Sequence, residues 1–335
     1  MKSLRTTLVL LVILVVILSF TLLAESQEKR DGQSKSDDVK LNIDLVTLDA
    51  QVVEQKANRI AWKLKQDDFI LYEDGIKQKI TNFSQDTLPL SVILLIDRVG
   101  SMDPFRDEVK DATAETIKTL RPDDEVAVMT FSKEVMLFQP FGASKEKIAH
   151  LLDFLPDPEP TTHSHCFNRA FYEAAHYMRK SGNPNGRRVI VLISAINEGG
   201  NCSGPSTEQT TNEVLESGST VCAMLVRDGN QITENIIKHG VAKLSGAGSI
   251  NAKSLIEETG GESVDGKPKN FEFQFDSLIT RLRTRYAIGF VSSNTKHDGT
   301  YRKLKLEISP EAEQREGKLV VTTRRGYIAK KEEPK

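Results

Sequence analysis

The chain has 335 residues, of which 39% are hydrophobic, and this length allows one large or two modest globular domains. Lys and Arg together number 45 against 47 Asp and Glu, which gives a formal net charge of -2 at pH 7. This near balance excludes the strongly basic composition that is typical of proteins binding nucleic acids or anionic membrane surfaces, so we expect no nucleic-acid partner.

The N-terminus has the pattern of an export signal. Lys2 and Arg5 precede residues 6–24, an uncharged stretch rich in Leu, Val and Ile. Residues 1–24 predict either a cleaved signal peptide or an uncleaved membrane anchor, since the stretch approaches the roughly 20 residues that span a bilayer. Because positive residues favour the cytoplasmic side, the rest of the chain is expected to be periplasmic, secreted or anchored to the inner membrane through residues 6–24.

Two short β segments are expected to flank the centre of the chain. Residues 25–38 are charged and polar and predict a flexible tether. Residues 39–88 contain period-two apolar runs broken by turn residues, including a hairpin turn in which Gly75 supplies a positive φ. Strands are expected again in residues 285–329, before a charged tail at residues 330–335. Because neither segment is long enough for a core of its own, we expect them to pair into one small β domain.

Residues 89–284 follow a different pattern, in which continuous apolar runs that suit buried strands alternate with amphipathic stretches that suit helices. The predicted strands cover residues 91–97, 125–131, 188–194 and 220–226. The predicted helices cover residues 107–120, 145–155, 168–180, 207–217 and 252–259, with a last helix near residues 273–283. This alternation predicts an α/β fold with a doubly wound, mostly parallel sheet.

The first of these apolar strands ends in Asp97, and the loop from there to Ser101 resembles the D-x-S-x-S loop of von Willebrand factor type A domains. The order of the predicted elements that follow is similar as well. The flanks resemble those of an exported subgroup common in acidobacteria, at residues 67–75, 285–290 and 325–327. The resemblance covers residues 39–329 and implies a domain that binds another macromolecule and catalyses no reaction.

In this family, serines, a threonine and aspartates at the carboxyl edge of the sheet hold a divalent cation, and a ligand carboxylate completes the coordination. Carried over onto this chain, Asp97 and Ser101 match the first loop, whereas Val99 replaces its middle serine. A valine side chain has no atom that can coordinate an ion. The resemblance therefore leaves Asp97 and Ser101 as the candidate metal ligands.

The second and third loops depart further from the family pattern. His165 stands where the threonine belongs, although Thr162 and Ser164 are near enough in sequence to supply a hydroxyl. Ala195 takes the place of the aspartate of the third loop. These departures imply a degenerate ligand-binding site, with no cofactor or with weakly bound Mg²⁺.

Two other functions remain open. His163, His165 and Cys166 could ligate zinc or form part of a catalytic group in a hydrolase, with Glu198 and Cys202 as the other ligands in reach. Solvated loop histidines are the simpler interpretation of this segment. A purely structural component of the envelope is the second alternative.

The cysteines matter because an exported chain meets an oxidising compartment. Cys222 lies within an apolar strand and is expected to be a buried free thiol. Cys166 and Cys202 lie in two loops over the sheet edge where family members hold the cation, so we predict a disulfide between them.

The sequence contains no nucleophile elbow, P-loop or H-E-x-x-H motif. The predicted function is therefore an exported adhesion or interaction module, whose partner is another protein of the envelope or the extracellular space.

Overall fold

The computed structural model describes residues 45–57, 59–85, 88–155, 165–183, 186–196, 199–200, 202–226 and 250–331. The predicted export signal and tether lie outside these residues, as do Thr162, His163, Ser164 and Glu198. Within the described ranges, no helix is both long enough and apolar enough to cross a membrane.

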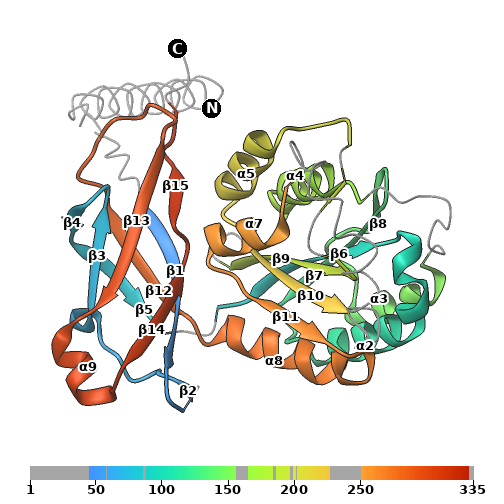
Figure 1. Ribbon diagram of the computed structural model, residues 1–335, viewed down its shortest axis with the longest axis horizontal. Helices are drawn as coiled ribbons and strands as arrows, with labels where there is room; N and C mark the ends of the chain where they lie inside the picture. Colours follow the sequence, from blue (N-terminus) through green and yellow to red (C-terminus); the bar gives the residue numbers. More distant parts are fainter. Residues whose placement is uncertain are drawn as a thin grey trace, which may run out of the picture. The chain divides into compact units, whose positions relative to one another are not determined.

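The centre of the chain forms a six-stranded sheet in the order β11-β10-β9-β6-β7-β8 (Figure 1). Neighbouring strands from β11 to β7 run parallel, and β8 pairs antiparallel with β7. All residues of β6 are buried, as expected for a strand covered on both faces. The strands are β6 (Leu90–Asp97), β7 (Glu125–Phe131), β8 (Val135–Gln139), β9 (Arg187–Ser194), β10 (Thr220–Val226) and β11 (Ser263–Gly266).

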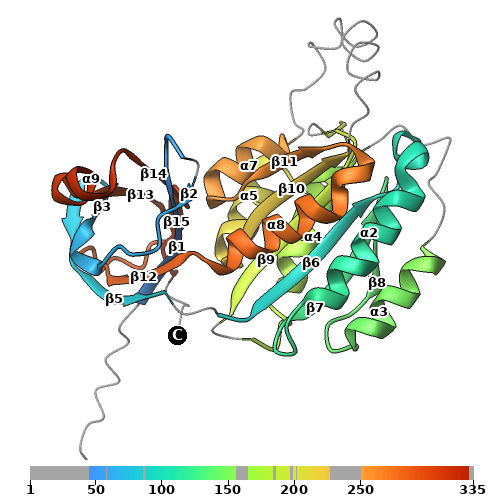
Figure 2. The same ribbon diagram turned by 90° about the horizontal axis from the view of Figure 1, so that it is seen from below.

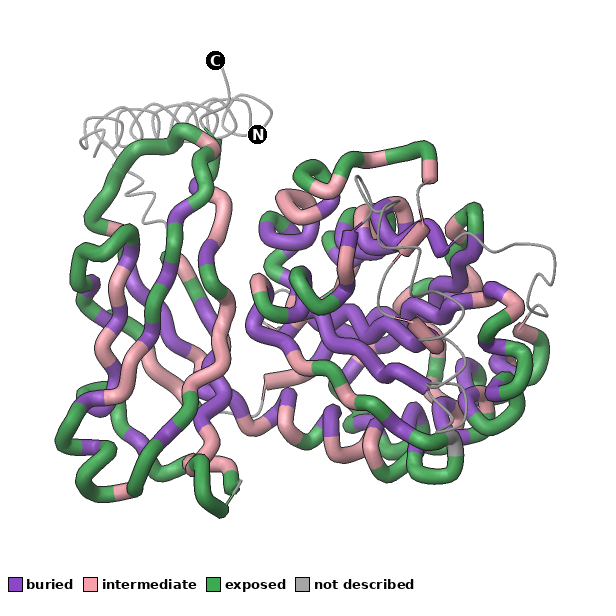
Figure 3. Tube along the Cα trace, viewed as in Figure 1, coloured by how far each residue is buried: buried purple, intermediate pink, exposed green. Residues whose placement is uncertain are grey.

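Helices cover both faces of this sheet, so the predicted doubly wound α/β fold is confirmed (Figure 2). On one face, the apolar core is formed with α2 (Arg106–Thr119), α3 (Lys145–Leu151) and α8 (Phe271–Arg283). On the other face it is formed with α4 (Phe167–Met178), α5 (Thr207–Glu216) and α7 (Ala252–Thr259). Figure 3 shows the sheet as an almost continuously buried layer between them.

The flanking segments form two further sheets, in which strands from both ends of the chain pair with each other. In the first sheet, β1 pairs antiparallel with β12 and β14, and β12 also pairs with β5. In the second sheet, of order β15-β13-β3-β4, β13 pairs antiparallel with β3. The elements are β1 (Leu45–Glu54), β2 (Arg59–Ile60), β3 (Phe69–Glu73), β4 (Ile76–Gln78), β5 (Ile80–Ser84), β12 (Tyr286–Val291), β13 (Tyr301–Ile308), α9 (Pro310–Glu316), β14 (Leu319–Thr323) and β15 (Gly326–Ile328).

The predicted hairpin turn lies between β3 and β4. Asp74 and Gly75 both have positive φ, 48° and 83°, which is the backbone that a tight two-residue hairpin turn requires. A shared core joins the sheets through Leu48, Leu71, Tyr286, Phe290 and Leu304. The boundaries of the β domain at residues 88 and 285 stay a prediction.

The elements that the sequence did not predict include β2, β8, β11, β15 and α9. β8 and β11 are short strands at the two edges of the central sheet, and β11 has the sequence Ser-Val-Asp-Gly. β15 has only three residues, and α9 is a polar helix in which Ala312 is the one buried residue. Such elements carry little hydrophobic periodicity, because few of their side chains contribute to a core.

Candidate functional site

Asp97 is the last residue of β6, and its carboxylate is buried at the carboxyl edge of the central sheet. Oδ2 accepts hydrogen bonds from Ser194 Oγ at 2.6 Å and from His165 Nδ1 at 2.7 Å. Oδ1 accepts a hydrogen bond from the backbone N–H of Val99 at 3.1 Å. The buried carboxylate is therefore satisfied by three donors from within the protein.

Ser194 reaches Asp97 because β9 runs parallel to β6 as its direct neighbour, so both strands end at the same edge of the sheet. The Ser194 side chain is fully buried, and its Oγ also accepts a hydrogen bond from the backbone N–H of Ile196 at 3.2 Å. Ser194 was not among the residues predicted for the site. Its position as the last residue of a predicted parallel strand was the feature of the sequence that could have placed it beside Asp97.

His165 is buried, with only 8% of its surface exposed, so the interpretation as a solvated loop histidine is wrong for this residue. Because an ionised carboxylate can only accept, Nδ1 of His165 carries the hydrogen of the bond to Asp97. The His165 carbonyl accepts hydrogen bonds from the N–H groups of Phe167 and Gly200, both at 2.9 Å. The ring and the main chain of His165 are thus both held in place by specific partners.

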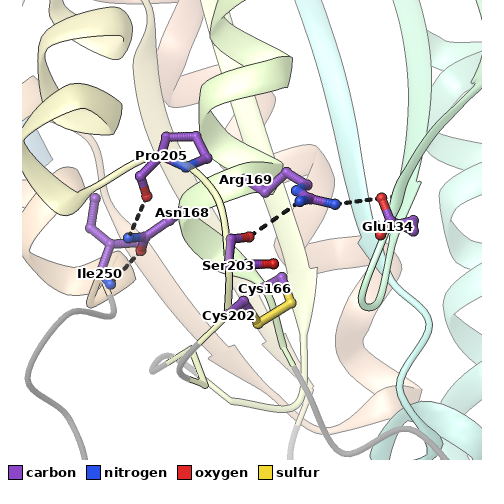
Figure 4. Close-up of a disulfide and its surroundings, with 8 residues drawn as sticks. All are labelled: Glu134, Cys166, Asn168, Arg169, Cys202, Ser203, Pro205 and Ile250. Atoms are coloured by element: carbon purple, nitrogen blue, oxygen red, sulfur yellow. Dashed lines mark hydrogen bonds and ion pairs between the residues drawn. A yellow bond between two sulfur atoms is a disulfide. The ribbon is translucent and has the colours of Figure 1, made fainter.

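Cys166 follows directly and forms the predicted disulfide with Cys202, which confirms that prediction (Figure 4). The two α carbons are 5.6 Å apart, within the range that a disulfide spans. Cys222 is a buried free cysteine, as predicted, and burial raises the pKa of its thiol to about 11. Because both sulfur atoms are in the disulfide, neither Cys166 nor Cys202 can bind zinc as a thiolate.

Polar contacts hold the loop around the disulfide against the start of α4 (Figure 4). Arg169 donates a hydrogen bond to the Ser203 carbonyl at 3.2 Å and forms an ion pair with Glu134. Asn168 Nδ2 donates to the Pro205 carbonyl at 3.1 Å, and its Oδ1 accepts from the backbone N–H of Ile250 at 2.6 Å. The disulfide is therefore one of several links between these loops.

Of the remaining predicted ligands, only Ser101 lies within the described residues. Ser101 is exposed on a short 3₁₀ helix, Gly100–Phe105, whereas Val99 is buried. Ala195 has no donor atom beyond its backbone. Among the described residues, no group of three or more His, Cys, Asp and Glu side chains is arranged to hold a metal ion.

Residues 92–197 match the family model of the von Willebrand factor type A domain. No curated protein sequence matches the chain at a significant level. Among solved structures, proximal thread matrix protein 1 from the mussel byssus is 14% identical over 60% of this chain and 50% of that chain, with a TM-score of 0.44. This chain therefore spans about half the length of the mussel protein.

Two bacterial structures are similar to a comparable degree. BatB from Bacteroides thetaiotaomicron is 14% identical over 58% of this chain and 98% of that chain, with a TM-score of 0.42. The vWF domain of the type V pili tip protein from Porphyromonas gingivalis is 11% identical over 58% of this chain and 95% of that chain, with a TM-score of 0.41. The family match covers about a third of the chain, from within β6 to just after the end of β9, and so lies in the central six-stranded sheet described above.

Proposed function

We propose that this chain is an exported protein-binding module that recognises its partner without a divalent cation. The observation that carries this proposal is that the buried Asp97 carboxylate already accepts hydrogen bonds from Ser194, His165 and the amide of Val99. In metal-dependent members of the family, the equivalent carboxylate faces the ion. Here the same carboxylate faces donors of its own chain.

The side chains of this chain do not fit a Mg²⁺ site at Asp97. Mg²⁺ needs near-ideal octahedral coordination by oxygen, yet the position of the middle serine holds the buried, apolar Val99. An ion bound to Oδ2 of Asp97 would compete with His165 and Ser194, whose hydrogen bonds to this charged oxygen contribute about 1.5–3 kcal/mol each. We therefore propose that the site is degenerate and binds Mg²⁺ weakly or not at all.

The presence of Asp97, His165 and Ser194 in one cluster raises the question of a serine hydrolase. In a catalytic triad, the serine hydroxyl bonds to the imidazole, and the aspartate bonds to the other ring nitrogen. Here the Ser194 hydroxyl donates to the carboxylate itself and is fully buried. This arrangement offers no hydroxyl to a substrate, which supports a binding function over catalysis.

The loops at the carboxyl edge are the proposed binding surface, since open α/β sheets bind their ligands at the carboxyl ends of the strands. Exposed residues on three of these loops include Ser101, Lys133 and Ser203. The disulfide and the Asp97–His165 contact lie beneath them and fix their backbone. We propose that a partner contacts this loop surface directly, without an intervening ion.

We further propose that the chain belongs to the exported subgroup suggested by its flanking motifs, and that it reaches the periplasm, the inner membrane or the exterior. The support is the N-terminal pattern of Lys2, Arg5 and the apolar stretch after them, together with the disulfide. N-terminal sequencing of the protein from fractionated cells tests export. Recovery of the full-length chain in the cytosol would contradict it.

The binding proposal is tested by photo-cross-linking from defined positions of the full chain in living cells. A photoreactive residue at Ser203 should cross-link one reproducible partner, and chelation of divalent cations should leave the yield unchanged. The matched control is the same residue at Gln314, which is exposed on α9. Equal cross-linking from both positions, or loss of the Ser203 product upon chelation, would overturn the proposal.

A further inference from the structure

A second candidate site lies at the opposite, amino edge of the central sheet. A cavity of about 420 Å³ is lined there by the first residues of β9 and β10 and by residues of β1 and β12. The cavity is within the size range of sites for small molecules. The charged residues that line it are Asp49, Arg187, Arg188 and Arg324.

Arg187 uses all three of its guanidinium nitrogens in contacts with the protein. Arg187 forms an ion pair with Asp49, with 3.0 Å between Nε and Oδ1. Its other nitrogens donate to the carbonyls of Arg283 at 3.2 Å and Arg285 at 2.6 Å. Asp49, the one acidic residue in the lining, is therefore already paired with Arg187.

The other two guanidinium groups have only backbone carbonyls as partners. Arg188 donates to the Ser217 carbonyl at 2.8 Å. Arg324 donates to the carbonyls of Gly326 at 2.9 Å and Leu215 at 3.1 Å. Within the part of the chain that the structure describes, neither group lies within ion-pair distance of a carboxylate. The direct contacts of these two guanidinium groups are thus with carbonyl oxygens.

Burial makes the positive charge costly at Arg324. Desolvation lowers the pKa of its guanidinium below the ordinary value, and the opposing attraction of the Asp49 and Glu258 carboxylates does not fully offset it. A bound oxyanion would supply the missing interaction, since a guanidinium presents donors in a geometry that matches carboxylate and phosphate oxygens.

We propose that this cavity is a binding site for a small polyvalent oxyanion, either a carboxylate or a phosphate, which Arg188 and Arg324 hold together. Arg188 belongs to the central sheet, whereas Arg324 follows β14 of the β domain. The ligand therefore connects the two domains directly. The site is independent of the carboxyl-edge loops and of the partner proposed for them.

Calorimetric titration of the full chain with inorganic phosphate and with citrate, at matched ionic strength, tests the proposal. At least one of the two should bind with a stoichiometry of one, and the tighter of them identifies the class of oxyanion. Arg188→Gln and Arg324→Gln should each weaken that binding at least tenfold.

The control variant is Arg325→Gln, which removes an exposed arginine paired with Glu257 and should leave binding unchanged. If Arg324→Gln does not fold, Arg188→Gln alone decides, because that side chain is only half-buried. Absence of binding by both anions, or equal affinity of the parent and Arg188→Gln, would overturn the proposal. Equal weakening by Arg325→Gln would also overturn it, because it would indicate screening of general surface charge.

Discussion

The two edges of the central sheet differ in how their charged groups are satisfied. At the carboxyl edge, the buried carboxylate of Asp97 accepts hydrogen bonds from three donors of the same chain. At the amino edge, Asp124 is paired with Arg283, whereas Arg188 and Arg324 donate hydrogen bonds to carbonyl oxygens. On our proposals, the same parallel topology supports a site closed to cations at one edge and an oxyanion site at the other. The fold positions the edge, while the side chains determine which ligand it binds.

The largest effect is expected from breaking the ion pair at the amino edge. Asp124 accepts hydrogen bonds from Arg283 and from the backbone N–H groups of Leu90 and Arg121. Asp124→Ala leaves the buried Arg283 charge unpaired and should lower the free energy of unfolding by about 3–5 kcal/mol, measured by urea denaturation. Lys118→Met, which removes an exposed pair with Glu115, should cost less than about 1 kcal/mol. Equal losses in both variants would contradict this account.

The same pair sets the sign of a pH effect. Burial opposes ionisation of Asp124, but the hydrogen bonds from Arg283 and the two amides outweigh it and hold the pKa of this carboxyl below its ordinary value. The pair therefore contributes stability at pH above the unfolded pKa of roughly 3.9, and loses it as the pH falls through the lowered native pKa. Asp124→Ala should show a weaker acid dependence of unfolding than the parent. An identical dependence would contradict this assignment.

The next largest loss of stability is expected at the carboxyl edge, where the disulfide joins residues 36 positions apart. Cys166→Ala combined with Cys202→Ala should lower the free energy of unfolding by about 3–4 kcal/mol in the chain-entropy model. Under reducing conditions the variant and the parent should differ little. Thiol counting on denatured, unreduced protein should find only Cys222, and three free thiols would refute the disulfide.

Cys222 provides a further check on the native state. Its thiol has a pKa of about 11, raised by burial, so at pH 8 only about one molecule in a thousand carries the reactive thiolate. Native protein should therefore resist alkylation at pH 8, whereas denatured protein should react at once. Rapid alkylation of the native protein would show that the strand around Cys222 opens readily.

The smallest stability effect is expected from Ser194→Ala, which removes one of the two side-chain hydrogen bonds to Asp97. Because this bond is to a buried charge, its loss should cost about 1.5–3 kcal/mol in urea denaturation. Ser254→Ala removes an exposed hydrogen bond to a backbone carbonyl and should cost less than about 0.5 kcal/mol. No difference between these two variants would show that Asp97 does not depend on Ser194.

The fold was largely predictable where the chain is strongly apolar. The predicted limits of β7, β10 and α7 agree with the structure, because each element contributes several side chains to a core. Edge strand β8 was missed because its side chains, including the exposed Met136 and Leu137, lack an alternating pattern.

The site was predictable only in part. Asp97 and the disulfide followed from their positions at the ends of predicted elements. The contact of His165 with Asp97 did not, because periodicity does not specify which loop side chain fills the space beside a buried charge. The need of a buried carboxylate for donors could have directed attention to Ser194, the terminal residue of the neighbouring strand.

The central claim, that the carboxyl edge is closed to a divalent cation, is tested most directly by calorimetric titration of the native protein with Mn²⁺. A matched variant that restores the family donors, Val99→Ser with His165→Thr and Ala195→Asp, serves as the positive control. The account predicts no tight binding by the parent and measurable 1:1 binding by the restored variant. Sub-micromolar affinity of the unaltered protein, lost in Asp97→Asn, would contradict the account.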